Sequence, residues 1–99
     1  GVMGGQYQAA GHARVLSNIY DFEMDIQTAL DAPRSFFENG SLRIERGYSE
    51  NTIQKLSSLG HNIDTKISPI GGAQAIKINE NGVLQGASDP RKDGCAIGY

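Results

Sequence analysis

A hairpin signal near the carboxyl end of the chain decides the fold, where residues 73–87 read AQAIKINENGVLQGA. The segments 73–78 and 83–87 are rich in apolar residues, and Asn81-Gly82 between them favours a tight turn. We therefore predict two antiparallel strands joined through Asn81-Gly82.

An earlier segment carries the same signal. Phe36-Phe37 and residues 42–45 flank Asn39-Gly40, a pair that accepts the positive φ values of a tight hairpin turn. A second hairpin is predicted there. One further half-buried strand is expected from residues that alternate with polar neighbours: Ile63, Thr65 and Ile67.

Two helices are predicted before the first hairpin. Over residues 9–22 the apolar side chains recur at helical spacing and form one stripe: Ala9, Ala13, Leu16 and Ile19 or Tyr20, broadened by Val15 and Phe22. Asp25 is a candidate N-cap for a short second helix that runs through Leu30. Pro33 ends this helix because the residue before a proline avoids helical geometry.

A third helix is predicted between the two hairpins. Ser49 is its expected N-cap and Gly60 its C-terminal stop. Tyr48 and Ile53 have the spacing of a hydrophobic staple across the N-terminus of the helix. Three residues share its apolar face: Ile53, Leu56 and Leu59.

The order of the predicted elements is helices, strands, a helix and strands. Such segregation favours an α+β fold with antiparallel hairpins and about three helices, and not a parallel doubly wound sheet. A length of 99 residues allows one domain or a piece of one, so residues 1–99 are treated as a single domain fragment. Because the chain begins Gly1-Val2-Met3, we expect that it was processed or cut from a longer protein.

Composition excludes several classes of function. Nine Lys and Arg residues against eleven Asp and Glu give a net charge of -2, and without a basic patch no nucleic-acid partner is expected. The apolar runs are too short for a membrane segment. A single cysteine, Cys95, forms no internal disulfide, and His12 and His61 have no partner at ligand spacing. We predict no metal and no cofactor.

The chain carries none of the common stand-alone catalytic signatures, such as a Gly-x-Ser-x-Gly elbow, a phosphate loop or a His-Glu-x-x-His pair. The candidate site is Gly4-Gly5, just before the first helix. Backbone amides without side chains can approach a ligand there, and the helix dipole favours negative charge, as an oxyanion hole requires. A plain turn into the helix is the alternative interpretation.

Other polar features are interpreted as structural. Gly71-Gly72 is expected to form a tight turn into the next strand, and residues 86–94 a loop held by hydrogen bonds and an Asp–Arg pair. His12 and His61 are expected to be partly exposed hydrogen-bonding residues. A cluster of carboxylates is interpreted as the solvated rim of a helix junction: Asp21, Glu23 and Asp25.

Several segments together resemble the γ-glutamyltransferase family, and the similarity extends over essentially the whole chain. The segments occur in the family's order and spacing: Gly1 to Gly5, Asn18, Asp21, Ala29 to Arg34, Gly60-His61, Gly71 to Ile76, Gly86 to Arg91 and the terminal Gly98-Tyr99. The Ala-Pro-Arg element and the Gly-Ala-Ser-Asp-Pro-Arg tail make the resemblance specific.

This resemblance implies the C-terminal part of the small subunit of an N-terminal-nucleophile hydrolase, an αββα sandwich made by a proenzyme that cleaves itself. In the family, an N-terminal threonine attacks the γ-glutamyl amide of glutathione or a related compound, and the acyl group passes to water or an amino acid. The family's oxyanion-holding Gly-Gly motif falls on Gly4 and Gly5, the only catalytic residues that the resemblance assigns here.

The resemblance places the other functional groups outside residues 1–99. The expected partners are the rest of the small subunit, the large subunit and a γ-glutamyl small molecule, and the chain alone is expected to be inactive. Many members have Ser-Pro where this chain has Val2-Met3, which leaves donor preference open, and some relatives are acylases. A non-catalytic interaction module is the alternative. Family members are often exported and cytoplasmic members are possible, so localisation is not predicted.

Overall fold

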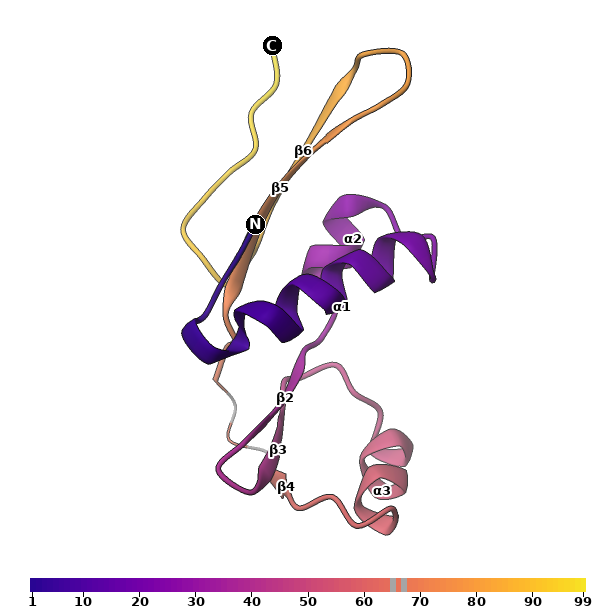
Figure 1. The fold of residues 1–99 in the computed structure, drawn as a ribbon, viewed down its shortest axis with the longest axis vertical. Helices are drawn as coiled ribbons and strands as arrows, with labels where there is room; N and C mark the ends of the chain where they lie inside the picture. The colour runs from indigo at the N-terminus through magenta and orange to yellow at the C-terminus, as the bar shows by residue number, and fades with distance from the viewer. Residues whose placement is uncertain (65, 67) are drawn as a thin grey trace. The chain divides into compact units, whose positions relative to one another are not determined.

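A computed structural model describes residues 1–64, 66 and 68–99. The chain forms two compact units (Figure 1). One unit joins Gly1–Ala32 to Gly71–Tyr99, and the other consists of Pro33–Ile70. The assignment of residues 1–99 to a single domain of a longer protein remains a prediction.

The sheet of the first unit is built on the predicted carboxyl-terminal hairpin. Strands β5 (Gly72–Ile78) and β6 (Leu84–Ser88) pair antiparallel, with Ala75 opposite Ala87. In the connecting loop the Gly82 amide donates to the Asn79 carbonyl at 2.8 Å, and Gly82 has a φ of 80°. A turn followed by a left-handed glycine is a common three-residue hairpin connection.

A third strand, β1 (Val2–Met3), was not expected from the sequence. It pairs antiparallel with β5, with Val2 opposite Ala73 and Met3 opposite Gly72, so the strand order is β1-β5-β6. Two residues are too short to show alternation, which explains why the pattern did not reveal this strand.

Three helical elements follow β1: a 3₁₀ turn, η1 (Gly5–Tyr7), then α1 (Gln8–Tyr20) and α2 (Ile26–Asp31). The predicted N-cap of α2 is confirmed, because the Asp25 side chain accepts hydrogen bonds from the amides of Gln27 and Thr28. The helix ends before Pro33, where Ala32 has left helical geometry with a ψ of 140°.

The buried face of α1 differs from the predicted stripe. Gly11, Val15 and Asn18 are buried, whereas Leu16 is 53% exposed and Tyr20 is 73% exposed. A Cβ atom on Gly11 would lie 2.6 Å from the Val2 side chain, so this glycine permits close approach of α1 to β1. Val15 belongs to the predicted stripe and is buried, whereas the part of the stripe that contains Leu16 and Tyr20 is left uncovered by the described residues.

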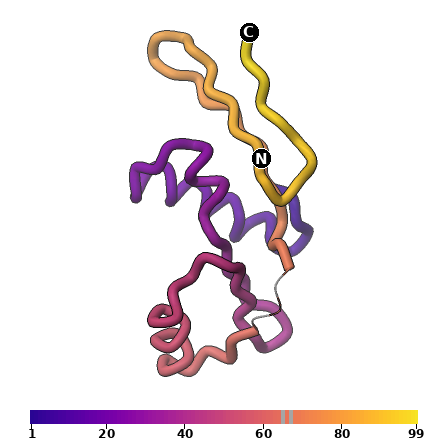
Figure 2. Tube along the Cα trace, turned by 180° about the vertical axis from the view of Figure 1, so that it is seen from behind, coloured from indigo at the N-terminus to yellow at the C-terminus, as the bar shows by residue number. Residues whose placement is uncertain are grey.

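The core of the first unit lies between the helices and one face of the sheet. Its buried apolar residues come from every element of the unit except the 88–99 tail: Val2, Tyr7, Val15, Ile26, Ala29, Leu30, Ala73 and Ala87. Beyond β6 the chain turns back and runs beside the hairpin, as Figure 2 shows from behind.

The second unit contains the other predicted hairpin, β2 (Ser35–Glu38) and β3 (Ser41–Ile44), which pair antiparallel. Asn39 and Gly40 have φ values of 51° and 77°, as the Asn-Gly pair predicts for a two-residue turn. Strand β4 (Ile63–Asp64) pairs parallel to β3, a pairing that the sequence pattern did not predict. Two residues of the predicted third strand, Thr65 and Ile67, lie outside the described residues.

Helix α3 (Glu50–Ser58) connects β3 to β4. The Ser49 hydroxyl accepts from the Thr52 amide at 3.1 Å, which confirms the predicted N-cap. Gly60 follows the helix with a φ of 98°, as a C-terminal stop requires. Of the predicted apolar face, Ile53 and Leu56 are half-buried and Leu59 is exposed. The mixed helices and sheets confirm the α+β class.

Candidate active site

Gly4-Gly5 forms the link between β1 and η1. Gly4 has a φ of 141° and Gly5 a φ of 56°, both in the range that disfavours residues with a side chain. The Gly4 carbonyl accepts a hydrogen bond from the Tyr7 amide at 3.0 Å, which closes the turn into the helical segment. The backbone conformation of this link therefore depends on glycine at both positions.

The two amides of this link are available to a ligand. Both residues are exposed, and none of the residues that the structure describes accepts a hydrogen bond from the amide of Gly4 or Gly5. Gly5 begins a 3₁₀ turn that leads into α1, and free amides at the start of a helical segment can donate to an oxygen atom that carries negative charge. The assignment of Gly4 and Gly5 to an oxyanion hole remains a prediction.

Gly71, the residue before β5, packs against the link. A Cβ atom on Gly4 would lie 3.0 Å from the Gly71 Cα atom, and one on Gly71 would lie 2.6 Å from the Met3 carbonyl oxygen. Tyr7, only 3% exposed, fills the space beside both glycines. Gly71 therefore allows the chain to pass close to the Gly4-Gly5 turn just before β5 begins.

The predicted lock in the tail is confirmed and lies next to the same strand. Asp89 is 1% exposed, and its carboxylate accepts from the Ala73 amide at 2.8 Å and from the Arg91 amide at 2.9 Å. Arg91 also forms an ion pair with Asp89 at 3.1 Å. The Arg91 guanidinium donates to the carbonyls of Leu30 and Ala32, so the tail caps the C-terminus of α2.

His12 connects α1 to β1 through hydrogen bonds. Its Nε2 atom accepts from the Val2 amide at 3.1 Å. Its Nδ1 atom lies 2.7 Å from the Gln8 carbonyl, which can only accept a hydrogen bond, so the proton is on Nδ1. His12 is a hydrogen-bonding residue, as predicted, and it connects α1 to β1. His61 and Cys95 are both exposed.

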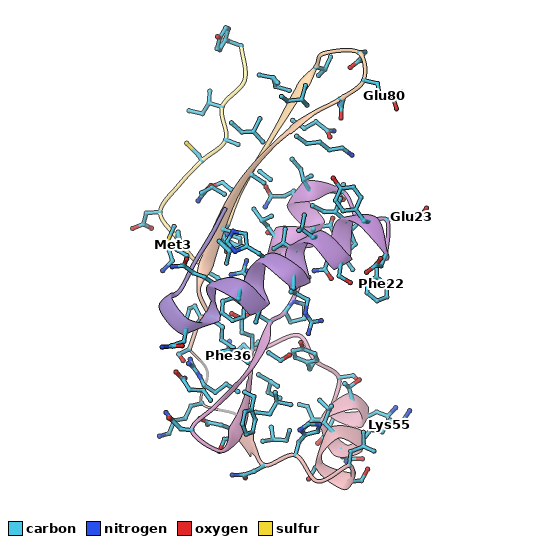
Figure 3. The ribbon with its side chains drawn as sticks, viewed as in Figure 1. Met3, Phe22, Glu23, Phe36, Lys55 and Glu80 are labelled. Carbon is cyan, nitrogen blue, oxygen red and sulfur yellow. The ribbon has the colours of Figure 1, made fainter. Side chains whose placement is uncertain are left out.

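The acidic cluster lies far from Gly4-Gly5. Figure 3 shows Met3 at the beginning of α1, and Phe22 and Glu23 at the opposite end of the helix. Asp25 is exposed and caps α2; the hydrogen bond from the Thr28 hydroxyl, together with the Thr28 and Gln27 amides, lowers the pKa of its carboxyl group below its ordinary value of 3.8. The interpretation of these carboxylates as a helix-junction rim agrees with this placement.

Two further observations concern membrane spans and metal ligands. None of the helices in the part of the chain described by the structure has both the length and the apolar character that a membrane crossing requires. Across the same residues no three His, Cys, Asp or Glu side chains gather as metal ligands would.

Similar solved structures identify the fold class of this chain. A γ-glutamyltranspeptidase of Pseudomonas nitroreducens superposes on 100% of this chain and 53% of its own, with a TM-score of 0.88 and 25% sequence identity. A cephalosporin acylase of Bacillus halodurans superposes on 100% of this chain and 20% of its own, with a TM-score of 0.90 and 36% identity. The fold is that of the N-terminal-nucleophile hydrolases.

The family follows from the sequence comparisons. The family model described as gamma-glutamyltranspeptidase matches residues 1–99, and the chain belongs to the γ-glutamyltranspeptidase family. The glutathione hydrolase-like YwrD proenzyme of Bacillus subtilis is 36% identical over 107 aligned positions, which include 99% of this chain and 20% of the relative. The oxamate amidohydrolase proenzyme of Klebsiella pneumoniae is 31% identical, again over 20% of its length. The chain spans about a fifth of these relatives.

Proposed function

We propose that residues 1–99 are the C-terminal part of the small subunit of an enzyme that cleaves γ-glutamyl amides and transfers the γ-glutamyl group to water or an amino acid. The observation that carries this proposal is the exposed pair of amides at Gly4 and Gly5, which have no acceptor among the described residues. Their glycine-only conformation explains why no side chain obstructs the approach of a substrate.

The amides act when charge develops on the substrate. A threonine hydroxyl supplied by the upstream part of the small subunit attacks the γ-carbonyl carbon and loses its proton to its own α-amine. The carbonyl oxygen becomes an oxyanion that accepts hydrogen bonds from Gly4 and Gly5. Collapse of this intermediate breaks the C–N bond, and the amine leaves with the proton. Water or an amino acid then attacks the acyl-enzyme and restores the threonine.

The chain alone lacks the attacking group and is therefore inactive in this proposal. Thr28 donates its hydroxyl to Asp25, and the Thr52 hydroxyl pairs with that of Ser49, so both described threonines are internal and engaged in helix caps. A homogeneous preparation of residues 1–99 should release nothing from a γ-glutamyl anilide.

A second candidate differs in the acyl group and not in the catalytic principle. Relatives include the Pseudomonas acylase ACY 1 proenzyme, 34% identical over 85% of this chain, as well as the oxamate amidohydrolase and the cephalosporin acylase. The same two amides would serve hydrolysis of another amide equally well. Turnover of glutathione, γ-glutamyl anilide, oxamate and a cephalosporin side-chain amide by one full-length preparation separates the two candidates.

The test of the oxyanion assignment uses alanine at Gly5 in the full-length enzyme, with Gly82→Ala as its control. A Cβ atom at either position meets no atom within 4 Å, and both residues have positive φ, so the backbone strain is similar and only Gly5 lies at the site. Gly4→Ala adds a steric conflict with Gly71 and serves as the more severe variant.

In Gly5→Ala and Gly4→Ala the added methyl group lies where the backbone and the substrate come close, and it displaces the amides from the oxyanion. The acylation rate should fall by about 10² to 10³, with a much smaller effect on substrate binding, because the hydrogen bonds from these amides to the oxyanion are strongest in the transition state. Gly82→Ala should leave turnover near the parent value. Thermal unfolding and subunit cleavage are measured beside the kinetics, so that a slow enzyme is distinguished from one that never assembled. Near-normal acylation in well-folded Gly4 and Gly5 variants would leave these residues as a simple turn.

A further inference from the structure

Strand β5 has an open edge beyond the end of β1. Gly1 and Gln74 exchange two hydrogen bonds: the Gly1 nitrogen donates to the Gln74 carbonyl at 2.7 Å, and the Gln74 amide donates to the Gly1 carbonyl at 3.1 Å. Beyond Gln74, β5 continues to Ile78, and among the described residues β6 is the only strand that pairs with this part of β5 (Figure 1).

The direction of each backbone group along β5 follows from this pair. Backbone groups alternate between the two edges of a strand, so the amides and carbonyls of Ile76 and Ile78 face the same edge as those of Gln74. Those of Ala75 and Lys77 face β6. No described residue accepts from the amides of Ile76 or Ile78 on the open edge, and their side chains are 74% and 73% exposed.

An apolar groove of about 430 Å³ adjoins this edge on the helix side of the sheet. Side chains of α1 that the core leaves uncovered form one wall, and β5 forms the other. Leu16, Ile19 and Tyr20 line the groove from α1, and Ala75 and Lys77 line it from β5. The groove therefore continues the apolar stripe of α1 that remained exposed.

We propose that the residues immediately before Gly1 in the longer protein extend β1 along β5 and fill this groove. The inference rests on the proposed function only in requiring that residues 1–99 belong to a longer chain. Residues 1–99 cover about a fifth of the length of the relatives. The occupant is this chain's own upstream segment because the Gly1–Gln74 pair already aligns β1 with the open edge, with no change of direction.

The register is specific. Val2 lies opposite Ala73 and Met3 opposite Gly72, so the residue before Gly1 lies opposite Ala75 and the second residue before Gly1 opposite Ile76. Val2 and Ala73 face the helices, with Val2 against Gly11 of α1. By alternation, the first and third residues before Gly1 place their side chains in the groove, and the second points to the opposite face of the sheet.

A disulfide tests this register in the full-length proenzyme. Because Gly1 and Gln74 form a hydrogen-bonded pair, the next pair, Ala75 and the residue before Gly1, is a non-hydrogen-bonded pair. The Cα atoms of such a pair lie about 4.5 Å apart. This distance is within the range that a disulfide spans. The variant carries Cys95→Ser, Ala75→Cys and a cysteine directly before Gly1. In the matched control the added cysteine is moved to the second position before Gly1, where its side chain points to the other face.

We expect an intramolecular disulfide to form in the first variant under mild oxidation and not in the control, as detected by peptide mass spectrometry. Equal cross-linking in both variants, cross-linking between molecules, or no cross-link in either would overturn the proposal. Amide exchange in the otherwise unmodified proenzyme provides a second test that does not depend on the folding of a variant. The amides of Ile76 and Ile78 should be protected from exchange. Rapid exchange at both amides would contradict the extension of β1 along β5. Hydrolysis of a γ-glutamyl anilide is measured separately, so loss of the proposed activity leaves this result unaffected.

Discussion

Gln27 and Ser88 exchange two hydrogen bonds across the first unit. The Ser88 amide donates to Gln27 Oε1 at 3.1 Å, and Gln27 Nε2 donates to the Ser88 carbonyl at 2.9 Å. The side-chain amide thus pairs with the outer edge of β6 as a neighbouring strand would. Gln27 Nε2 also donates to Asp31 Oδ1 at 2.8 Å, so one side chain connects α2 to the sheet.

Gln27→Glu should destabilise this connection. The substitution keeps the size of the side chain but replaces the donor with an oxygen that faces the Ser88 carbonyl and the Asp31 carboxylate. We expect a loss of about 1 to 3 kcal/mol in the free energy of unfolding, the usual consequence of an unsatisfied, partly buried polar group. Urea unfolding and amide exchange in α2 of the full-length protein measure it. Gln54→Glu, on the exposed face of α3, is the control and should change stability by less than about 0.5 kcal/mol.

Gly71→Ala should be much more destabilising than Gly82→Ala. Both residues have positive φ values, 67° and 80°, so each alanine carries similar backbone strain. Only at Gly71 does the added methyl group collide, at 2.6 Å from the Met3 carbonyl oxygen and 2.7 Å from the Tyr7 ring. We expect the difference in unfolding free energy between the two variants to exceed about 2 kcal/mol. Equal stability of the two variants would show that β1 does not pack against Gly71.

Acid should weaken the N-terminus of α2 through Asp25. Hydrogen bonds from Thr28 and Gln27 stabilise the ionised carboxylate and lower its pKa in the folded protein. A depressed folded-state pKa contributes stability that is present above the unfolded-state pKa and is lost as pH falls from the ordinary value of 3.8 through the folded-state value.

Asp25→Asn provides the measurement, because asparagine keeps a capping oxygen and does not titrate. Amide exchange in α2, followed as pH falls below 3.8, should depend less on pH in this variant than in the parent. Asp93→Asn removes one exposed carboxylate elsewhere in the same unit and is the control. An unchanged pH dependence in Asp25→Asn would contradict a capping role for the charged form.

The isolated chain should self-associate or remain partly disordered. Large apolar side chains are exposed on α1 and on the β5–β6 hairpin, including Leu16, Tyr20, Ile76 and Ile78, and the edge of β5 lacks a neighbour beyond Gly1 among the described residues. Light scattering and amide exchange on residues 1–99 test this expectation. A monodisperse monomer with uniformly strong exchange protection would instead support an independent interaction module.

Sequence determined those features that depend on neighbouring residues. Asn39-Gly40 specifies a tight turn through its tolerance of positive φ, and Asp25 and Ser49 cap helices because a short polar side chain reaches the next free amides. The order of such local signals was sufficient for the α+β class, and the spacing of motifs was sufficient for the family. The glycine pair at the candidate site was also visible, as a backbone that any ligand could approach.

Tertiary structure alone decided what depends on residues far apart in the chain. The pairing of β1 with β5 and the contact of Gly4 with Gly71 have no local signature, since each segment alone is only a short turn or a two-residue strand. The apolar stripe of α1 was visible in the sequence, but its burial was not. Periodicity identifies an apolar face, whereas its exposure depends on which other segments are present to cover it, and in these residues Leu16 and Tyr20 remain uncovered.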